Sequence, residues 1–317
     1  MTSMRVLVTG ANGFVGQILC DRALARGMGV CGMVRKPCHL PKGVQRQVIK
    51  DWGEPVKTGS ALQGVTAVIH TAARAHIVGE LGQNSLAEFR KVNVDGTLNL
   101  ARQAVVAGVR RFVFISSIGV NGAETFAQPF SASDSPMPQS AYAASKHEAE
   151  QGLQALAAET GLEVVIIRPP LVYGPQAPGN FRALVRLVSS GWPLPFGCVT
   201  SNRRSFVAVD NLADLILTCL DHPAATNKTF LVSDGEDLST ADLVRRLGSA
   251  MGITVRLLPV PVGALALGAK LLGKPEKFQS LCGSLQVDIS ETRELLGWYP
   301  PIRVDEGLKR AVEDQRC

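Results

Sequence analysis

The sequence predicts an α/β fold, in which a doubly wound parallel sheet is followed by a smaller C-terminal lobe. Short runs that are apolar on both faces alternate with helical patterns over the first 169 residues, and a glycine-rich turn joins the first run to the first helix. Pro and Gly become dense over residues 169–197. Strands buried on both faces need helices on both sides, and parallel connections are right-handed. We therefore expect a first domain over residues 1–169 and a second mainly over 170–317, with a later return to the sheet, for instance at residues 228–232.

The elements of the first domain follow in order. Glycine after a helical pattern is a stop signal, and Gly27, Gly108 and Gly161 stand at such positions. Strands are expected at residues 5–9, 29–34, 67–70, 111–116 and 162–168. Helices are expected at residues 14–26, 85–107 and 142–160.

Composition excludes several classes of protein. The 317 residues are 46% hydrophobic and 19% charged, which is too apolar for disorder. The net charge is +6, but no run of five basic residues occurs, so a nucleic-acid partner is not favoured. Seven single Cys without a C-x-x-C pair indicate reduced thiols in a cytoplasmic chain.

Residues 257–273 are apolar, but the stretch is too short and too interrupted to span a bilayer. We expect a helix packed on the core there, with contact to a membrane surface as the lesser alternative.

The turn at residues 9–16 has the features of a phosphate-binding site. Gly10 permits a tight turn, Gly13 lets the backbone approach a pyrophosphate, and Gly16 lets the helix pack on the strand. The helix N-terminus adds free N–H groups and a positive dipole end. This arrangement predicts a Rossmann dinucleotide site; the alternative is a glycine-rich turn without a ligand.

The choice of dinucleotide depends on the end of the second strand. NAD-binding proteins usually carry an acid there for the ribose 2′-hydroxyl, whereas this chain has Arg35 and Lys36. A guanidinium can hold a 2′-phosphate through two N–H bonds, which favours NADP(H) over NAD(H). The alternative is two solvated loop cations. Asp51 suits the adenine amino group or a plain turn.

A phenol and an ammonium, Tyr142 and Lys146, fall at i and i+4 of an expected helix and so share one face. The positive charge is expected to lower the pKa of the phenol and fit it for proton transfer to a sugar or alcohol oxygen. Ser117 follows a strand end, where α/β sheets bind ligands. These three residues are the expected catalytic set.

The motifs together resemble the extended short-chain dehydrogenase/reductase superfamily, in its nucleotide-sugar epimerase/dehydratase branch. The resemblance implies Tyr142 as acid/base, Lys146 as its tuner and nicotinamide-ribose ligand, and Ser117 as hydroxyl partner. It also implies a UDP-sugar substrate and a homodimer. The matching residues include those at 10–16, 70–73, 92–97, 116–117, 142–146, 168–175 and 295–300. The expected cofactor-binding residues are Gly10, Asn12, Gly13, Phe14, Val15, Gly16, Arg35, Asp51, Trp52, Ala72, Ala73, Asn93, Tyr142, Lys146 and Leu171.

The resemblance also implies substrate contacts in the C-terminal lobe. Asn180 is expected at the substrate diphosphate, with a helix cap as the alternative, and Arg204 is expected on the same diphosphate. Phe196 resembles a residue that frames a uracil ring, and Ser117 is expected at the sugar. A second diphosphate Arg, usual in 4-epimerases, is not evident near residues 281–285.

Two further motifs narrow the chemistry. Dehydratases of this branch carry an Asp-Glu pair after the Ser, where this chain has Ile118 and Gly119, so a dehydratase is excluded and Ile118 is expected in the core. His70 and His76 are not at metal-ligand spacing with acids, and no metal is expected.

Three functions follow from this interpretation. The favoured one is NADPH-dependent reduction of a UDP-4-keto-6-deoxy-N-acetylhexosamine at C4, in O-antigen or lipopolysaccharide precursor synthesis. The alternative is a UDP-glucose or UDP-N-acetylglucosamine 4-epimerase with tightly held NAD. The least favoured is a non-catalytic cofactor-binding regulator, because Ser117, Tyr142 and Lys146 are all present.

Overall fold

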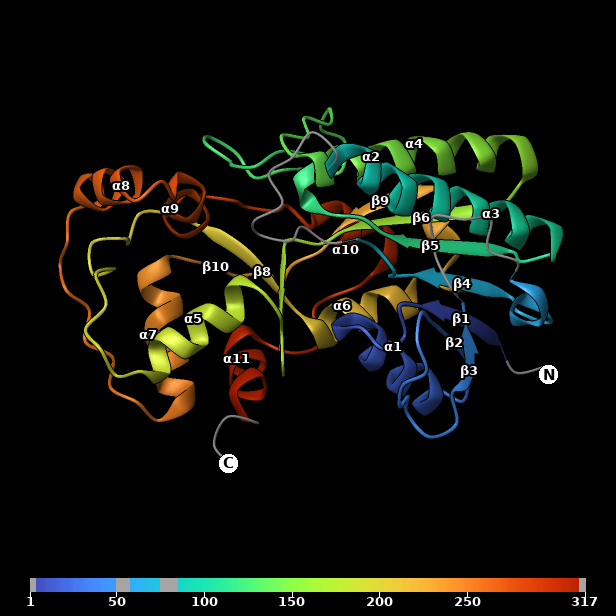
Figure 1. Ribbon diagram of the computed structural model, residues 1–317, viewed down its shortest axis with the longest axis horizontal. Coiled ribbons are helices and arrows are strands. Elements are labelled where there is room, and N and C mark those ends of the chain that lie inside the picture. The colour runs from blue at the N-terminus through green and yellow to red at the C-terminus, as the bar shows by residue number, and fades with distance from the viewer. Residues whose placement is uncertain (1–3, 50–57, 75–84, 314–317) are drawn as a thin grey trace.

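A seven-stranded parallel sheet runs through the N-terminal part of the molecule in the order β3-β2-β1-β4-β5-β6-β9 (Figure 1). The computed structural model describes residues 4–49, 58–74 and 85–313. The doubly wound parallel sheet predicted from the sequence is confirmed. The strands are β1 Arg5–Thr9, β2 Gly29–Val34, β3 Gln45–Val48, β4 Ala67–His70, β5 Arg111–Ile115, β6 Glu163–Arg168 and β9 Lys228–Leu231.

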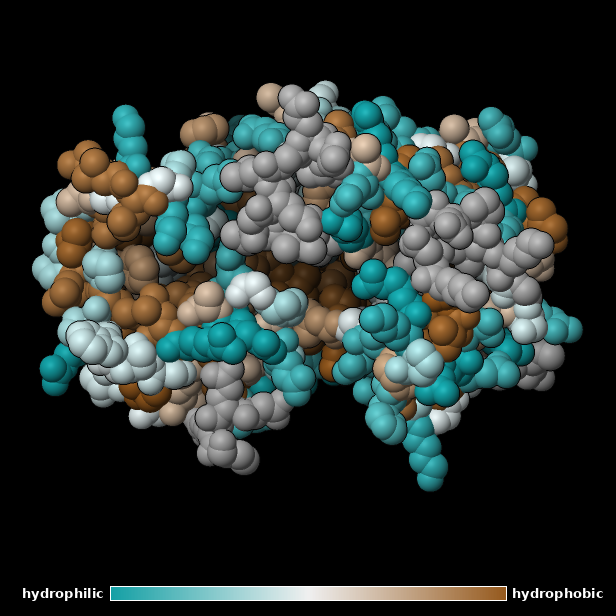
Figure 2. All heavy atoms as spheres, in the orientation of Figure 1, coloured by the Kyte–Doolittle hydropathy of each residue, from teal (hydrophilic) through white to brown (hydrophobic). Residues whose placement is uncertain are grey.

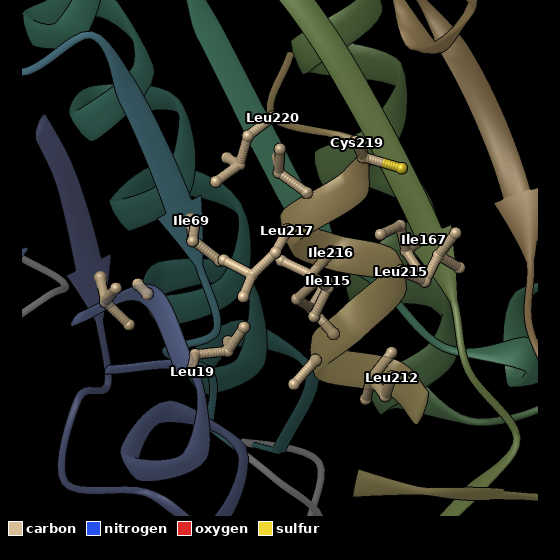
Figure 3. Packing of buried hydrophobic residues seen from close by; sticks show 14 of the residues in the cluster. Leu19, Ile69, Ile115, Ile167, Leu212, Leu215, Ile216, Leu217, Cys219 and Leu220 are labelled. Atoms are coloured by element: carbon tan, nitrogen blue, oxygen red, sulfur yellow. The ribbon is translucent and has the colours of Figure 1, made fainter. Parts of the chain in front are cut away.

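Helices cover both faces of this sheet. Alternate residues of one strand point to opposite faces, so Val6 and Val8 join one hydrophobic cluster while Leu7 joins the other. On the first face α1 (Phe14–Ala25) packs beside α6 (Val209–Thr218), as Figure 3 shows for Leu19 and Leu212. The second face is covered by α2 (Ser85–Phe89), a π-helical segment (Arg90–Asp95), α3 (Gly96–Val106) and α4 (Ala141–Thr160).

Two predictions about this sheet need correction. The helix expected over residues 85–107 contains the π-helical segment Arg90–Asp95, with Asn93 buried inside it. Strand β3 was not predicted, because its sequence QRQV is polar and exposed at the sheet edge. The return of the chain near residue 228 is confirmed by β9, which pairs with β6.

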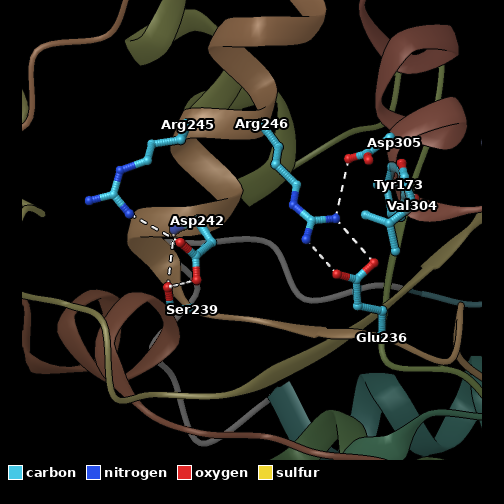
Figure 4. Close-up of polar contacts among 8 residues, drawn as sticks. All are labelled: Tyr173, Glu236, Ser239, Asp242, Arg245, Arg246, Val304 and Asp305. Carbon is cyan, nitrogen blue, oxygen red and sulfur yellow. Dashed lines mark hydrogen bonds and ion pairs between the residues drawn. The ribbon is translucent and has the colours of Figure 1, made fainter.

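The C-terminal lobe is built around a second sheet of three strands, in the order β10-β8-β7. In Figure 4, Arg246 on α7 contacts Glu236 and Asp305, which ties the helix to its neighbours. Ser239 caps α7, accepting from the Asp242 amide at 3.1 Å. The elements are β7 Leu171–Tyr173, β8 Arg204–Ala208, β10 Asp237–Leu238, α5 Asn180–Ser189, α7 Thr240–Met251, α8 Val262–Leu271, α9 Pro275–Cys282 and α11 Val304–Glu313.

The boundary at residue 169 divides the chain less simply than the sequence suggests. Besides β9, helix α6 and the segment with α10 (Ser290–Leu296) and Trp298 join the core under the seven-stranded sheet. The division into residues 1–169 and 170–317 therefore stays a prediction.

The apolar stretch at residues 257–273 contains α8, and the expectation that a helix there packs on the core is confirmed for one side of the helix only. None of its residues is fully buried. Val262 and Leu265 touch the hydrophobic cluster of the lobe, while Leu267 and Leu271 point away from it and are exposed. The lobe offers this helix only one side to pack against. No helix in the described ranges is long and apolar enough to cross a membrane.

Candidate active site

The glycine-rich turn forms one end of a cleft at the carboxyl edge of the parallel sheet. Gly10 has φ +65°, and a Cβ on Gly16 would lie 2.1 Å from the Gly10 carbonyl oxygen. Helix α1 begins after Gly13 with no side-chain cap and no acid in its first turn. The N–H groups of its first turn are therefore available to an anionic ligand such as a pyrophosphate, and Gly16 lets the helix start close to the strand end.

The cleft encloses about 1620 Å³ up to open solvent. Arg35 reaches it from the end of β2, and Arg74 joins it from the loop after β4. No described residue that lines it is acidic. Asp51, Trp52 and His76 lie outside the described residues. Of the predicted cofactor-binding residues, the cleft is lined by Gly10, Asn12, Gly13, Phe14, Val15, Gly16, Arg35, Ala72 and Ala73.

Asn93 does not line the cleft, and its expected contact with a cofactor stays a prediction. Its side chain accepts from the Arg74 amide at 2.8 Å and donates to the Arg74 carbonyl and to Ser145 Oγ. Because these bonds use its polar atoms, Asn93 positions the cleft loop against α4. The π-helical segment places this amide between the two.

His70 is buried and held by a threonine hydroxyl at each ring nitrogen. Its Nδ1 lies 2.8 Å from Thr9 Oγ1 and its Nε2 lies 2.9 Å from Thr97 Oγ1. Thr97 donates its proton to the Asn93 carbonyl, so Nε2–H must donate and Nδ1 must accept. Burial and the charge of Lys146 lower the pKa of His70 to about 3, which keeps the ring neutral. Among the described residues no cluster of three or more His, Cys, Asp or Glu side chains could hold a metal.

None of the three predicted catalytic residues lines the cleft, although Ile115 at the end of β5 does, and their contacts with a cofactor stay predictions. Tyr142 and Lys146 stand on α4, and Lys146 Nζ lies 4.2 Å from the centroid of the Phe114 ring. Ser117 follows β5, and its Oγ accepts from the Gly119 amide at 3.1 Å, which leaves the hydroxyl proton available. Ile118 is buried, as expected. In the described ranges the three predicted catalytic side chains make no hydrogen bond to one another.

The prediction that the pKa of Tyr142 is lowered is wrong for the protein without a bound cofactor. Burial raises the pKa of Tyr142 to about 12, and the Phe89 ring packs edge-on at 6.0 Å. Burial also lowers the pKa of Lys146 to about 7, opposed by the charge of Glu150. Desolvation disfavours both charged forms here and outweighs the attraction that the i, i+4 spacing suggested.

The buried ammonium predicts a specific pH dependence of stability. The pKa of Lys146 is lower in the folded chain than when unfolded, so unfolding takes up a proton between pH 7 and pH 10. Stability should rise with pH across this window by about 1.4 kcal/mol per unit. We expect Lys146→Met to remove that rise, measured by urea unfolding from pH 6.5 to 9.5. The exposed Lys228→Met should leave it unchanged; equal slopes in all three proteins would contradict the shift.

A second pocket of about 800 Å³ lies across β7 from the cleft. Leu171 lines this pocket whereas Val172 lines the cleft, since neighbouring strand residues face opposite ways. Asn180 and Arg204 line it too. Gly179, not Asn180, is the N-cap of α5. Arg204 is half-buried and donates to the Gly283 carbonyl at 3.0 Å.

The second pocket differs from the sequence prediction at two points. Phe196 is buried in the hydrophobic cluster of the lobe and does not line the pocket, and its contact with a uracil ring stays a prediction. Lys277 on α9 does line it and supplies a second cation. No sequence pattern points to Lys277, because only the fold brings α9 beside β8.

Comparison with known proteins gives the family. Residues 6–233 match the family described as NAD dependent epimerase/dehydratase. The chain belongs to this family. A "UDP-glucose 4-epimerase" of Vibrio cholerae is 46% identical over 97% of this chain and 94% of the relative.

Solved structures of this family have the same fold. A UDP-glucose 4-epimerase of Thermotoga maritima, solved with UDP-glucose, superposes with a TM-score of 0.80 at 23% identity over 99% of both chains. The NAD complex of a UDP-glucose 4-epimerase from Thermus thermophilus superposes with a TM-score of 0.76 at 25% identity, also over 99% of both chains. The predicted superfamily and branch are thereby confirmed.

Proposed function

We propose that this protein is an NAD-dependent 4-epimerase of a UDP-sugar. The observation that carries the proposal is the 46% identity to a UDP-glucose 4-epimerase over 97% of the chain, in a chain that has Ser117, Tyr142 and Lys146. The epimerase is thus favoured over the reductase that the sequence alone suggested.

The residues present fit the cofactor and the chemistry. The bare N-terminus of α1 and the close approach at Gly16 suit a pyrophosphate. When bound, NAD would supply reversible hydride transfer at C4 of the sugar. Tyr142 would accept the proton of the C4 hydroxyl and later give it back, and Ser117 would hold the C4 oxygen. Protonated Lys146 would stabilise the phenolate of Tyr142 and so oppose the burial that raises the pKa of Tyr142.

The pocket lined by Asn180, Arg204 and Lys277 would hold the diphosphate of the substrate. Two cations near one diphosphate supply the charge that the missing second Arg would have given. The UDP-sugar would then extend past β7 towards the cleft.

One experiment tests the function. We expect the purified protein to release NAD on denaturation and to interconvert UDP-glucose with UDP-galactose, or UDP-N-acetylglucosamine with its 4-epimer, without added cofactor. No NAD and no interconversion, with NADPH consumed on a UDP-4-keto-6-deoxy-N-acetylhexosamine, would show the reductase instead. Arg35 in the cleft is the observation that keeps this second candidate.

The position of Arg35 in the cleft predicts a difference in affinity between NADPH and NADH. Arg35→Ala is expected to weaken binding of NADPH about ten- to hundredfold, because a charged hydrogen-bonded pair with a 2′-phosphate contributes about 1.5–3 kcal/mol. Binding of NADH should hardly change, since it has no 2′-phosphate. Fluorescence titration of cofactor-free protein with both cofactors measures this. Equal loss for both would show that Arg35 does not contact a 2′-phosphate.

Arg204 predicts a loss in substrate binding. Arg204→Met should raise the KM for the UDP-sugar about tenfold or more, because a half-buried guanidinium that would hold the diphosphate is lost. The neighbouring Arg203 is exposed and bonds only to nearby carbonyls, so Arg203→Met is the matched control. Steady-state kinetics of both variants are the measurement; the same KM in both would remove Arg204 from the substrate site.

A further inference from the structure

Helix α8 leaves an apolar face uncovered at the outer end of the C-terminal lobe. Leu267, Leu271 and Leu272 are 61%, 79% and 74% exposed, and we call these three the α8 face. Figure 2 shows hydrophobic residues gathered at this end of the molecule. The opposite side of α8 packs on the lobe through Val262 and Leu265. Isolated exposed leucines are ordinary, but three on one short segment mark an interaction surface.

The chain around this face is mainly basic. Residues 252–287 contain four cations, Arg256, Lys270, Lys274 and Lys277, against the single acid Glu276. Lys270 and Lys274 are exposed within a helical turn of Leu271. A partner that covers the α8 face must therefore offer an apolar surface to the three leucines and negative charges to the lysines around them.

A second copy of this chain does not meet that description. A twofold contact through the α8 face would bring its lysines against the same lysines of the other copy, and like charges at an interface repel. A bilayer with acidic headgroups offers both surfaces, because the leucines can enter the acyl boundary while the lysines stay with the phosphates.

We propose that the α8 face docks this protein on the surface of an anionic lipid bilayer. With ten residues, α8 is about 15 Å long and lies on the bilayer rather than crossing it. The following helix α9 lines the pocket with Arg204 and Lys277, so docking brings that pocket close to the headgroups. The docking does not depend on the proposed epimerase activity.

Sedimentation with vesicles tests the proposal on the full chain. We expect binding to vesicles of phosphatidylcholine with 30% phosphatidylglycerol and at least tenfold weaker binding to phosphatidylcholine alone. Leu267→Ser/Leu271→Ser should lower the binding at least tenfold, whereas Val106→Ser, at a 90% exposed valine of α3, should not. Activity on a UDP-sugar in solution should stay unchanged in all three proteins.

Charge reversal separates a local effect from net charge. Lys270→Glu/Lys274→Glu is expected to lower binding to the anionic vesicles by more than about 25-fold, since each lysine near such a surface contributes roughly fivefold. Arg102→Glu/Lys309→Glu changes the net charge equally at exposed sites elsewhere and should keep most of the binding. Absence of vesicle binding, or equal loss in both pairs, would overturn the proposal. So would light scattering that shows a dimer dispersed by Leu267→Ser/Leu271→Ser.

Discussion

Tyr142→Phe is expected to lower turnover by about two to four orders of magnitude. The change removes the group that would move the C4 hydroxyl proton, and general acid–base catalysis accounts for a factor of that size. The fold should be kept, because in the described structure the Tyr142 hydroxyl makes no hydrogen bond and the ring packing on Phe89 is retained. Turnover of the UDP-sugar and the amount of NAD retained are the two measurements.

Tyr299→Phe is the matched control, since this tyrosine is 66% exposed and stands on the segment after α10. It should keep full activity. If Tyr142→Phe also turns over at the unmodified rate, another group carries the proton and the catalytic assignment fails. If it loses NAD as well as turnover, the phenol contributes to cofactor binding more than this mechanism requires.

Gly16→Ala is expected to abolish retention of the dinucleotide. The new methyl group would lie 2.1 Å from the Gly10 carbonyl oxygen and 2.9 Å from Ala11 Cα, and both are backbone atoms that cannot rotate away. The turn and the start of α1 must separate, which displaces the N–H groups offered to the pyrophosphate. Overpacking of this kind also destabilises the fold by about 1–3 kcal/mol. Cofactor released on denaturation and the urea midpoint measure the two effects.

Gly268→Ala is the control for this change. A Cβ at Gly268 meets no atom within 4 Å, and the residue lies inside α8, where alanine is the better helix former. We expect unchanged cofactor content and a stability equal to or slightly above that of the unmodified protein. Full NAD retention in Gly16→Ala would mean that the cofactor does not sit over this turn.

The first domain was predictable because its pattern is local. Strands such as β2 and β4 are apolar on both faces and end at turn signals, so their bounds could be predicted to the residue. Strand β3 was missed because edge strands need no apolar face. The π-helical segment at Asn93 was missed because its cause is the buried amide held by the Arg74 backbone and Ser145, a contact between distant parts of the chain.

The candidate active site also has parts that depend on local sequence and parts that depend on contacts between distant residues. The sequence by itself determined the phosphate-binding turn, since Gly13 and Gly16 are required by contacts within the turn, although Gly10 also lies close to Thr71 and Ala72 of the loop after β4. It also placed Tyr142 and Lys146 on one helix face, which follows from helical spacing. Only the tertiary structure decided the protonation of these two groups, because their pKa values depend on burial by residues from other elements.

The same holds for the C-terminal lobe. Lys277 reaches the pocket of Arg204 only because α9 folds back beside β8, whereas Phe196 turns into the hydrophobic cluster. The sequence showed that residues 257–273 are apolar, and the structure decided that one side of α8 stays uncovered. Apolar composition sets how much surface must be covered, but which side is covered depends on the elements that happen to lie against it.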